Sequence, residues 1–280
     1  MADTIEKANM LNEQFQSVFT SEYDDPIPDK GTSKHPNIPP LTISIPGIKQ
    51  LLNNINSHKA TGPDNISGRV LKELQDKTAP MLNLIFTKSF HTGQTPIDWK
   101  TSHVAPAFKK GDKHKAVNYR SISLTCICWK LMEHIVTKHV INHIENNKFL
   151  YELQHGFRHN RSNDTQLLSF IQELSETDNK YIQTGLIIMD FAKAFDIVPH
   201  RRLLYKLNYY GISGLTLHWI SAFLTNRTQT VVIDGKSSST VPVTSGVLQV
   251  TVLGHVFFLV YINDLSDYLI HSQLIISQHD

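Results

Sequence analysis

The sequence predicts a globular chain of the α+β class. Segments with the apolar period of helices alternate with short apolar runs of strand length, which indicates both element types. An Asp-Gly turn at 234–235 between two strand-like runs predicts a β-hairpin beside the helices, rather than a regular parallel alternation. With 280 residues, 40% of them hydrophobic, the chain can bury a sizeable core as one large domain or two subdomains.

The N-terminal forty residues predict a helix followed by a linker. Residues 4–20 place apolar side chains such as Leu11 and Phe15 on one helical stripe, which is typical of an amphipathic helix docked on a partner surface. The next residues, up to about 40, are rich in Pro, Gly, Ser and charge without an apolar period. We therefore expect residues 1–40 to be a connector helix and a Pro-rich linker.

The middle of the chain is predicted to be mostly helical. Proline cannot donate the helical hydrogen bond, so a break is expected at Pro80. A turn is expected at Gly111. The predicted helices are 45–56, 67–77, 80–91, 126–146 and 162–176, and the predicted strand is 103–108.

The C-terminal part mixes strands and helices. The apolar run before Asp190 predicts a strand over 184–191, and Pro199 is suited to begin a helix. The remaining predicted elements are helices at 199–210, 214–225 and 251–263 and the hairpin at 228–243.

Charge, cysteine content and hydropathy limit the partners and the cellular compartment that we expect for the protein. The net charge of +2 is too small to indicate a nucleic-acid partner by itself. Cys126 and Cys128 lie roughly 200° apart on the predicted helix, so they face neither one metal ion nor each other, and a reducing intracellular setting fits best. The longest apolar stretch, 256–262, is far shorter than a membrane span, so no membrane partner is expected. Nuclear and cytoplasmic location both stay open.

Asp190 is the residue whose position most needs a chemical explanation. An ionised carboxylate at the end of an apolar strand requires a cation or hydrogen-bond donors, which favours either a metal site or a capped turn. Asp196 precedes a proline-initiated helix, where a carboxylate is favourable whatever the function. From these residues alone both interpretations of Asp190 stay open.

Five sequence blocks, in order, resemble one protein family. They are KATGPDNI at 59–66, FKKGDKHKAVNYRSISL at 108–124, QHGFRHNRSNDTQL at 154–167, MDFAKAFDIVPH at 189–200 and SGVLQVTVLG at 245–254. Together they resemble the reverse transcriptase domain of non-LTR (LINE-type) retrotransposons over about residues 58–266. The amphipathic opening is similar to the connector that precedes the polymerase in such elements.

The resemblance implies a right-hand polymerase fold. It places the fingers at 41–170 and the palm at 171–280, truncated before or at the strand that carries two adjacent aspartates, with the thumb absent. It also implies a two-metal nucleotidyl transfer with Mg²⁺, or Mn²⁺ in its place, on an RNA template, a DNA primer and deoxynucleoside triphosphates.

The same resemblance gives roles to individual residues. Asp190 would hold the metal ions, and Phe191 would contribute its backbone carbonyl to one of them. Phe195 would press on the sugar and exclude a 2′-hydroxyl. The remaining implied contacts are Lys109 or Lys110 with Arg120 on the triphosphate, and Gln249 on the incoming base pair or the template.

Two histidine-containing patterns give weaker evidence for a binding site than the five blocks do. His155, Arg158, His159 and Arg161 form a basic cluster that suits template phosphates, although any exposed loop can have this composition. Arg158 and Arg161 are our predicted nucleic-acid contacts. A pair of histidines at 139 and 143 has the spacing of zinc ligands without an evident third ligand, and we interpret it as a solvated helix face.

The sequence also departs from the family pattern. After the NDL at 263–265 the family carries two adjacent aspartates, where this chain has Ser277 and Gln278. Neither the Asp24-Asp25 pair in the predicted linker nor Asp280 at the terminus is a suitable substitute.

Four substitutions lie within the family blocks or directly after one of them. Leu248, Ser121 and His255 replace prolines, and Val250 replaces a glycine. We therefore predict an RNA-directed DNA polymerase core by ancestry, inactive in this copy. The alternative is a non-catalytic remnant that retains RNA or DNA binding or has no selected role.

Overall fold

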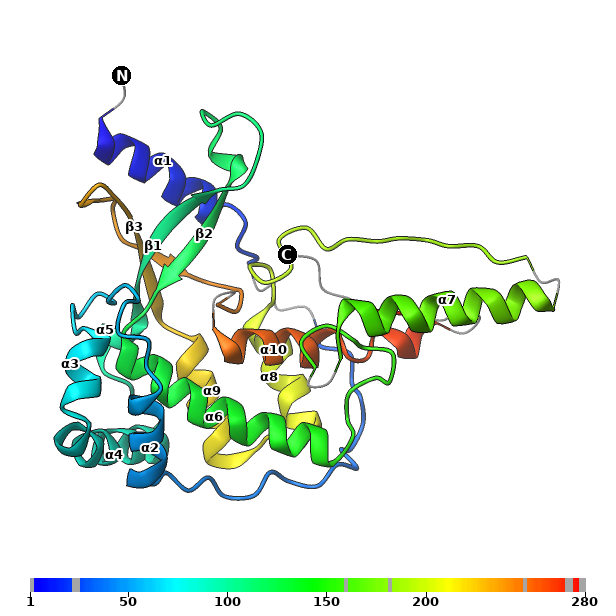
Figure 1. The fold of residues 1–280 in the computed structure, drawn as a ribbon, viewed down its shortest axis with the longest axis horizontal. Helices are drawn as coiled ribbons and strands as arrows, with labels where there is room; N and C mark the ends of the chain where they lie inside the picture. The colour runs from blue at the N-terminus through cyan, green and yellow to red at the C-terminus, as the bar shows by residue number, and fades with distance from the viewer. Residues whose placement is uncertain are drawn as a thin grey trace.

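The fold combines a small sheet with a helical layer and a projecting arm (Figure 1). The computed structural model describes residues 3–21, 26–158, 161–180, 183–248, 251–269 and 274–276. Helices and a mixed sheet are both present, which confirms the predicted α+β class.

Five short strands form the sheet. They are β1 (Thr101–Phe108), β2 (Tyr119–Leu124), β3 (Arg227–Ile233), β4 (Lys236–Ser237) and β5 (Val241–Val243). The order is β2-β1-β3-β4, and β5 also pairs with β3. The β1–β3 pair is parallel and the others are antiparallel. The sheet therefore joins two distant parts of the chain.

The hairpin between β3 and β4 follows the sequence signal. Asp234 and Gly235 have positive φ angles of 48° and 74°. Two positive φ angles are what a two-residue hairpin turn of the primed type requires, so the Asp-Gly pair sets this turn as predicted.

Helix α1 (Thr4–Gln16) packs on the sheet. Its buried Ala8, Leu11 and Phe15 form a small core with Val104 of β1 and Val231 of β3. The Asp3 side chain and Glu6 make a capping box at its N-terminus. The predicted amphipathic helix is confirmed, and its docking surface is the protein's own sheet.

The main core lies among the helices. Trp129, Trp219 and Phe223 are almost fully buried at its centre, and the Trp129 and Phe223 rings stack with centroids 5.1 Å apart. The helices of this layer are α2 (Ile45–Asn53), α3 (Gly68–Glu73), α4 (Gln75–Thr92), α6 (Ile127–Asn146), α8 (His200–Tyr209), α9 (Gly214–Leu224) and α10 (Val252–Ile262). Short pieces complete the fold: α5 (Ile97–Lys100), η1 (Ala116–Asn118) and η2 (Leu265–Tyr268).

The expected break at Pro80 is wrong. Pro80 lies inside α4, and the interruption falls at Leu74, between α3 and α4. Pro80 is the sixth residue of α4, so its missing N–H costs the helix one hydrogen bond, the one to the Asp76 carbonyl. Burial of the neighbouring Ala79 and Leu82 keeps the segment helical in the core.

The segment 26–44 has no regular secondary structure but is not a free linker. Lys30 Nζ lies 2.8 Å from Asp264 Oδ2, and the Ile38 N–H donates to the Gly211 carbonyl at 2.8 Å. His35 makes ring contacts with Phe149, Tyr209 and Tyr210. The segment therefore runs along the helical layer, as Figure 1 shows in blue.

The predicted strand over 184–191 is wrong. Residues 183–190 have no strand assignment, and Ile187 and Ile188 are 83% and 84% exposed. Beside them runs α7 (Asn163–Asn179), in which none of the described residues is buried, and the two form the arm in Figure 1. An apolar, β-branched run favours a strand, but a strand forms only where a neighbouring backbone pairs with it.

In the part of the chain that the structure describes, no helix has the length and apolar character needed to cross a membrane.

Candidate active site

The residues singled out from the sequence lie on three segments. Lys109, Lys110 and Arg120 belong to the β1–β2 hairpin, and Asp190, Phe191 and Phe195 to the segment before α8. The third segment is the 245–248 loop between β5 and α10. Gln249 follows this loop and, with Val250, lies outside the described residues.

Two of these segments pack tightly against each other. The Val247 N–H donates to the Phe195 carbonyl at 2.8 Å, and the Gly246 N–H donates to the Val198 carbonyl at 2.9 Å. Ser245 Oγ donates to the Asp196 carbonyl at 2.7 Å. The 245–248 loop is thus anchored on the turn that leads into α8.

Gly246 makes this close approach feasible. Its φ is +88°, and a Cβ built there would lie 2.7 Å from the Asp196 carbonyl oxygen. Only glycine combines this backbone conformation with such contact. Ser245 and Gly246 were not among the predicted site residues, although an SG pair before an apolar residue is a recognisable turn signal.

Phe195 lies in a cluster of aromatic rings. Its centroid is 5.0 Å from Phe258, 5.5 Å from His255 and 5.9 Å from Phe157. The His255 and Phe157 rings stack at 4.1 Å. His255, which replaces a proline of the family pattern, is therefore accommodated by stacking, and Phe195 is half-buried rather than free.

Asp190 lies on the exposed coil beside this cluster. Phe191 is 51% exposed and its ring meets the edge of Phe258 at 6.2 Å. Among the described residues, no group of three or more His, Cys, Asp or Glu side chains could hold a metal ion. These residues do not fit a two-metal centre, which needs several carboxylate oxygens together.

Asp196 lies deeper than Asp190. Burial raises the pKa of its carboxyl, and the nearby Lys193 acts in the opposite direction. Asp196 comes before Pro199, which caps α8, and its carbonyl receives the Ser245 hydroxyl. Its observed role is to anchor the 245–248 loop.

The β1–β2 hairpin presents a group of cations. Arg120 pairs across from Ala107, and the Lys109 N–H donates to the Asn118 carbonyl at 2.9 Å. Lys109 and Lys110 are exposed, and Arg120 is half-buried. None of the hydrogen bonds, ion pairs or ring contacts within the described ranges joins these three residues to Asp190 or Phe195. The hairpin is connected to the 245–248 loop through β3 and β5 of the sheet.

The basic loop at 154–161 is engaged within the protein. Arg158 Nη1 donates to the Tyr151 carbonyl at 3.1 Å, and Arg161 forms an ion pair with Glu152. His155 Nδ1 lies 3.2 Å from Thr165 Oγ1. A template contact by Arg158 or Arg161 would have to share or replace these partners. His159 falls outside the described residues.

The interpretation of His143 as part of a solvated helix face is wrong. Its side chain is buried, Nε2 lies 2.9 Å from the Tyr210 carbonyl, and the ring meets the edge of Phe149 at 5.4 Å. The two cysteines are free and buried. The Asp24-Asp25 pair and Ser277, Gln278 and Asp280 lie outside the described residues.

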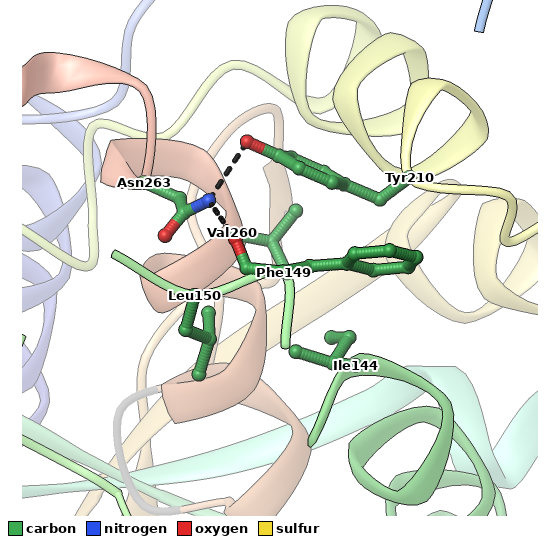
Figure 2. Close-up of a pocket in the computed structure, with 6 residues that line it drawn as sticks. All are labelled: Ile144, Phe149, Leu150, Tyr210, Val260 and Asn263. Carbon is green, nitrogen blue, oxygen red and sulfur yellow. Dashed lines mark hydrogen bonds between the residues drawn. The ribbon is translucent and has the colours of Figure 1, made fainter. Parts of the chain in front are cut away.

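A small pocket lies between α6, α8 and α10 (Figure 2). The side chains that line it leave no room for even a water molecule, so it is not a small-molecule site. The Asn263 amide nitrogen donates to the Phe149 carbonyl and to the Tyr210 hydroxyl, both at 2.8 Å. The Asn263 oxygen accepts the Tyr151 N–H at 2.7 Å. This asparagine is a structural connector and not a ligand-binding group.

Sequence reasoning missed two buried charges near the site. Glu133 of α6 is 2% exposed and Arg227 of β3 is 4% exposed. Burial raises the pKa of Glu133 to about 7 and lowers the pKa of Arg227 to about 10. A Glu inside a helical apolar pattern and an Arg at the start of a strand give no signal of burial in sequence.

Comparison with known proteins agrees with the sequence blocks. A model of the family described as reverse transcriptase (RNA-dependent DNA polymerase) matches residues 108–278. The chain is 30% identical over 231 residues to the RNA-directed DNA polymerase from the mobile element jockey of Drosophila melanogaster, covering 82% of this chain and 25% of that protein.

Two further Drosophila melanogaster proteins are similar. The probable RNA-directed DNA polymerase from transposon BS is 24% identical over 90% of this chain and 28% of its own length. The probable RNA-directed DNA polymerase from transposon X-element is 24% identical over 78% of this chain and 24% of its own length. The chain thus spans about a quarter of the length of these relatives.

Proposed function

Because the chain belongs to the reverse transcriptase (RNA-dependent DNA polymerase) family of non-LTR retrotransposons, we propose that its 280 residues form the nucleotide- and template-binding face of such a polymerase. The observation that carries the proposal is the docking of the 245–248 loop on the Phe195–Val198 turn. This contact brings together two of the family's sequence blocks that are separated in the chain.

We assign the fingers to the region that contains β1 and β2, and the palm to the region that contains α8, α9 and α10. The cations of the β1–β2 hairpin support this assignment. Arg120 supplies a planar fork of donors for phosphate oxygens, and Lys109 and Lys110 supply exposed point charges. The triphosphate of a deoxynucleotide is the ligand that such a hairpin fits.

Phe195 is proposed to select the sugar by shape. Its ring is held by Phe157, Phe258 and His255, so it can act as a rigid wall. A wall of this kind excludes an added 2′-hydroxyl by steric contact. The hydrogen bond from Val247 to the Phe195 carbonyl fixes the backbone from which the ring projects.

We propose that these 280 residues bind substrates without extending a primer. Asp190 lies in exposed coil, and Ser277 and Gln278 stand where the family pattern has two adjacent aspartates. Because the described residues do not fit a two-metal centre, no step of nucleotidyl transfer is derived for them. Binding through the hairpin cations does not require that centre.

Photo-cross-linking to a labelled deoxynucleoside triphosphate on a primed RNA template tests the proposal. Arg120→Ala should lower cross-linking about tenfold, the effect of losing one charge-assisted hydrogen-bonding group. Lys88→Ala, which removes an exposed cation of α4, is the matched control and should have no effect. Equal cross-linking by wild type and Arg120→Ala would contradict the assignment of the hairpin.

Primer extension by the same purified chain tests the absence of synthesis. No extension above that of Asp190→Ala is expected. Incorporation that depends on Asp190 would overturn the prediction of inactivity. Salt-sensitive RNA binding without extension would support a binder that has lost catalysis.

A further inference from the structure

The projecting arm exposes a large amount of apolar surface (Figure 1). Its large apolar side chains present on the order of 800 Å² to solvent, whereas a monomeric soluble protein rarely exposes a contiguous apolar patch above a few hundred Å². This surface therefore needs a partner. The side chains, each more than half exposed, are Leu167, Leu168 and Ile171 of α7 and Leu186, Ile187, Ile188 and Met189 of the coil beside it.

The backbone of that coil is unpaired within one copy. Among the described residues, no backbone hydrogen bond joins residues 185–190 to another segment. The side-chain contacts lie at the two ends, where Thr184 Oγ1 donates to Thr177 Oγ1 at 3.0 Å and the Phe191 ring meets Phe258. The middle of the coil therefore has the free backbone groups of an edge strand that lacks its neighbour.

The sequence of this coil does not protect it from pairing. Sheet edges of soluble proteins are usually guarded by Lys, by Pro or by inward-pointing charges. Residues 184–191 contain neither Lys nor Pro, and their one charge is that of Asp190. Their apolar, β-branched composition favours a strand wherever a second backbone is supplied. An extended apolar segment is therefore the kind of partner that fits.

We propose that a second copy of the chain covers this surface, and that the two copies pair their residues 184–191 as antiparallel strands around a two-fold axis at Ile187. The arm projects from the body of the fold, so two arms can approach each other side by side (Figure 1). A stable interface buries roughly 800 Å² per partner, and the exposed apolar side chains of the arm supply an area of that size. The inference goes beyond the proposed function and does not depend on it.

Charge favours the antiparallel arrangement. Parallel pairing would place the two Asp190 carboxylates side by side, where like charges are destabilising. In the antiparallel arrangement Ile187 lies opposite Ile187 of the second copy, and Asp190 lies opposite Thr184. The two carboxylates are then six residues apart along the strands, or roughly 20 Å, which is beyond the reach of exposed charges in physiological salt.

The exposed side chains of α7 extend the interface. Because successive side chains of a strand point to opposite faces, Ile187 and Met189 of both copies share one face of the paired strands. Leu186 and Ile188 share the other face. The apolar side chains of α7 lie on the same arm and can cover one of these faces, so pairing removes more apolar surface from water than the strands alone provide.

Sedimentation equilibrium of the purified chain measures its oligomeric state. We expect a reversible dimer at micromolar concentration, the weak end of the range for interfaces of this size. Because apolar contacts drive the association, the dimer should persist at high salt, whereas an association bridged by nucleic acid would be lost there. A dimer that dissociates at high salt would therefore overturn the proposal.

A matched pair of substitutions tests where the contact lies. Ile187→Lys should raise the Kd of the dimer at least about a hundredfold, because each dimer loses two buried isoleucines and gains two like charges that face each other. Ile97→Lys is the control, since Ile97 lies outside the arm on α5 and is 84% exposed, against 83% for Ile187. The control should leave the Kd unchanged, and neither change should shift the urea midpoint of the monomer.

Disulfide formation tests the arrangement of the strands. Ile187→Cys should form a disulfide between copies under mild oxidation, because the Cα atoms of opposite residues in antiparallel strands lie about 4.5 to 5.5 Å apart. Met189→Cys should not, because its counterpart lies four residues away along the strands, or roughly 14 Å. Cys126 and Cys128 are buried, so they give little background.

Three further outcomes would overturn the proposal. A chain that stays monomeric at high concentration would mean that some other apolar segment is the partner of the arm. Equal Kd values for wild type and Ile187→Lys would place the contact elsewhere, and equal disulfide formation by Ile187→Cys and Met189→Cys would exclude the antiparallel arrangement. Assembly into large aggregates without a discrete dimer would equally contradict a two-fold contact.

Discussion

At the scale of single residues, the buried carboxyl of Glu133 makes the free energy of unfolding depend on pH. Its pKa is raised to about 7 by burial, from 4.5 for an ordinary glutamate, although Thr251, Leu253 and Arg227 oppose that rise. Between these two values the folded chain binds more protons than the unfolded chain. This carboxyl therefore lowers the free energy of unfolding as pH rises from about 4.5 through 7.

Glu133→Gln should remove this contribution. Urea unfolding of wild type and variant from about pH 4.5 to 8 should show that wild type loses stability with rising pH relative to the variant, by a few kcal/mol at most. The comparison is of differences, because histidines with lowered pKa, such as His134 and His139, contribute with the opposite sign in both proteins. Parallel pH profiles would show that Glu133 titrates normally.

The close approach of Gly246 to the Asp196 carbonyl can be tested by substitution. Gly246→Ala adds a Cβ 2.7 Å from the Asp196 carbonyl oxygen at a φ of +88°, so strain and steric overlap act together. We expect a loss of about 2 to 4 kcal/mol of unfolding free energy by urea denaturation. Gly235→Ala is the control, because its φ is +74° with nothing within 4 Å of the added atom. A loss no larger than that of the control would refute the close approach.

At the scale of elements, helices could be predicted from the sequence, whereas the pairing of distant strands could not. The helices at 127–146, 200–209 and 214–224 could be predicted because their apolar period is written in adjacent residues. The parallel pairing of β1 with β3 could not, because it depends on two segments far apart in sequence. The run at 184–191 has a strand-like composition, but no strand is assigned to it, because a strand also needs a neighbouring backbone that pairs with it.

The docking of α1 is an element-level prediction. Phe15 is buried against the sheet, so Phe15→Ala should cost about 3 to 5 kcal/mol and lower hydrogen-exchange protection in β1 and β3. Met10→Ala on the exposed side of the same helix, where Met10 is 57% exposed, should change neither. If β1 and β3 keep their protection in Phe15→Ala, α1 is not part of the folded unit.

At the scale of the whole molecule, the site is assembled from separated segments. The sequence blocks indicated the hairpin, the turn at Phe195 and the loop near Gln249, because each carries a recognisable local pattern. The aromatic cluster and the burial of Glu133 and Arg227 could not be predicted, since they depend on elements that meet only after folding. The coil conformation at Asp190 could not be predicted for the same reason, because a strand forms only where a segment from elsewhere in the chain pairs with it.

One buried carboxylate, that of Asp264, connects the segment 26–44 to the rest of the fold. Asp264 accepts Lys30 Nζ at 2.8 Å and Lys206 Nζ at 2.5 Å. Burial alone would raise the pKa of Asp264, but the hydrogen bonds from Lys206 and Lys30 hold it below its ordinary value. The carboxylate is therefore stabilising at neutral pH, and this contribution is lost only as pH falls below the usual range of aspartate.

Asp264→Asn should leave two partly buried lysines without their counter-ion and cost about 3 kcal/mol of unfolding free energy. It should also release the segment, so limited trypsin digestion should cut after Lys30 and Lys34 faster than in wild type. Asp267→Asn is the control, because the Asp267 side chain is 67% exposed and lies 3.9 Å from Lys30 Nζ. Equal cleavage of the two variants would mean that the segment is held by its ring and backbone contacts around His35 and Ile38 and not by this buried charge.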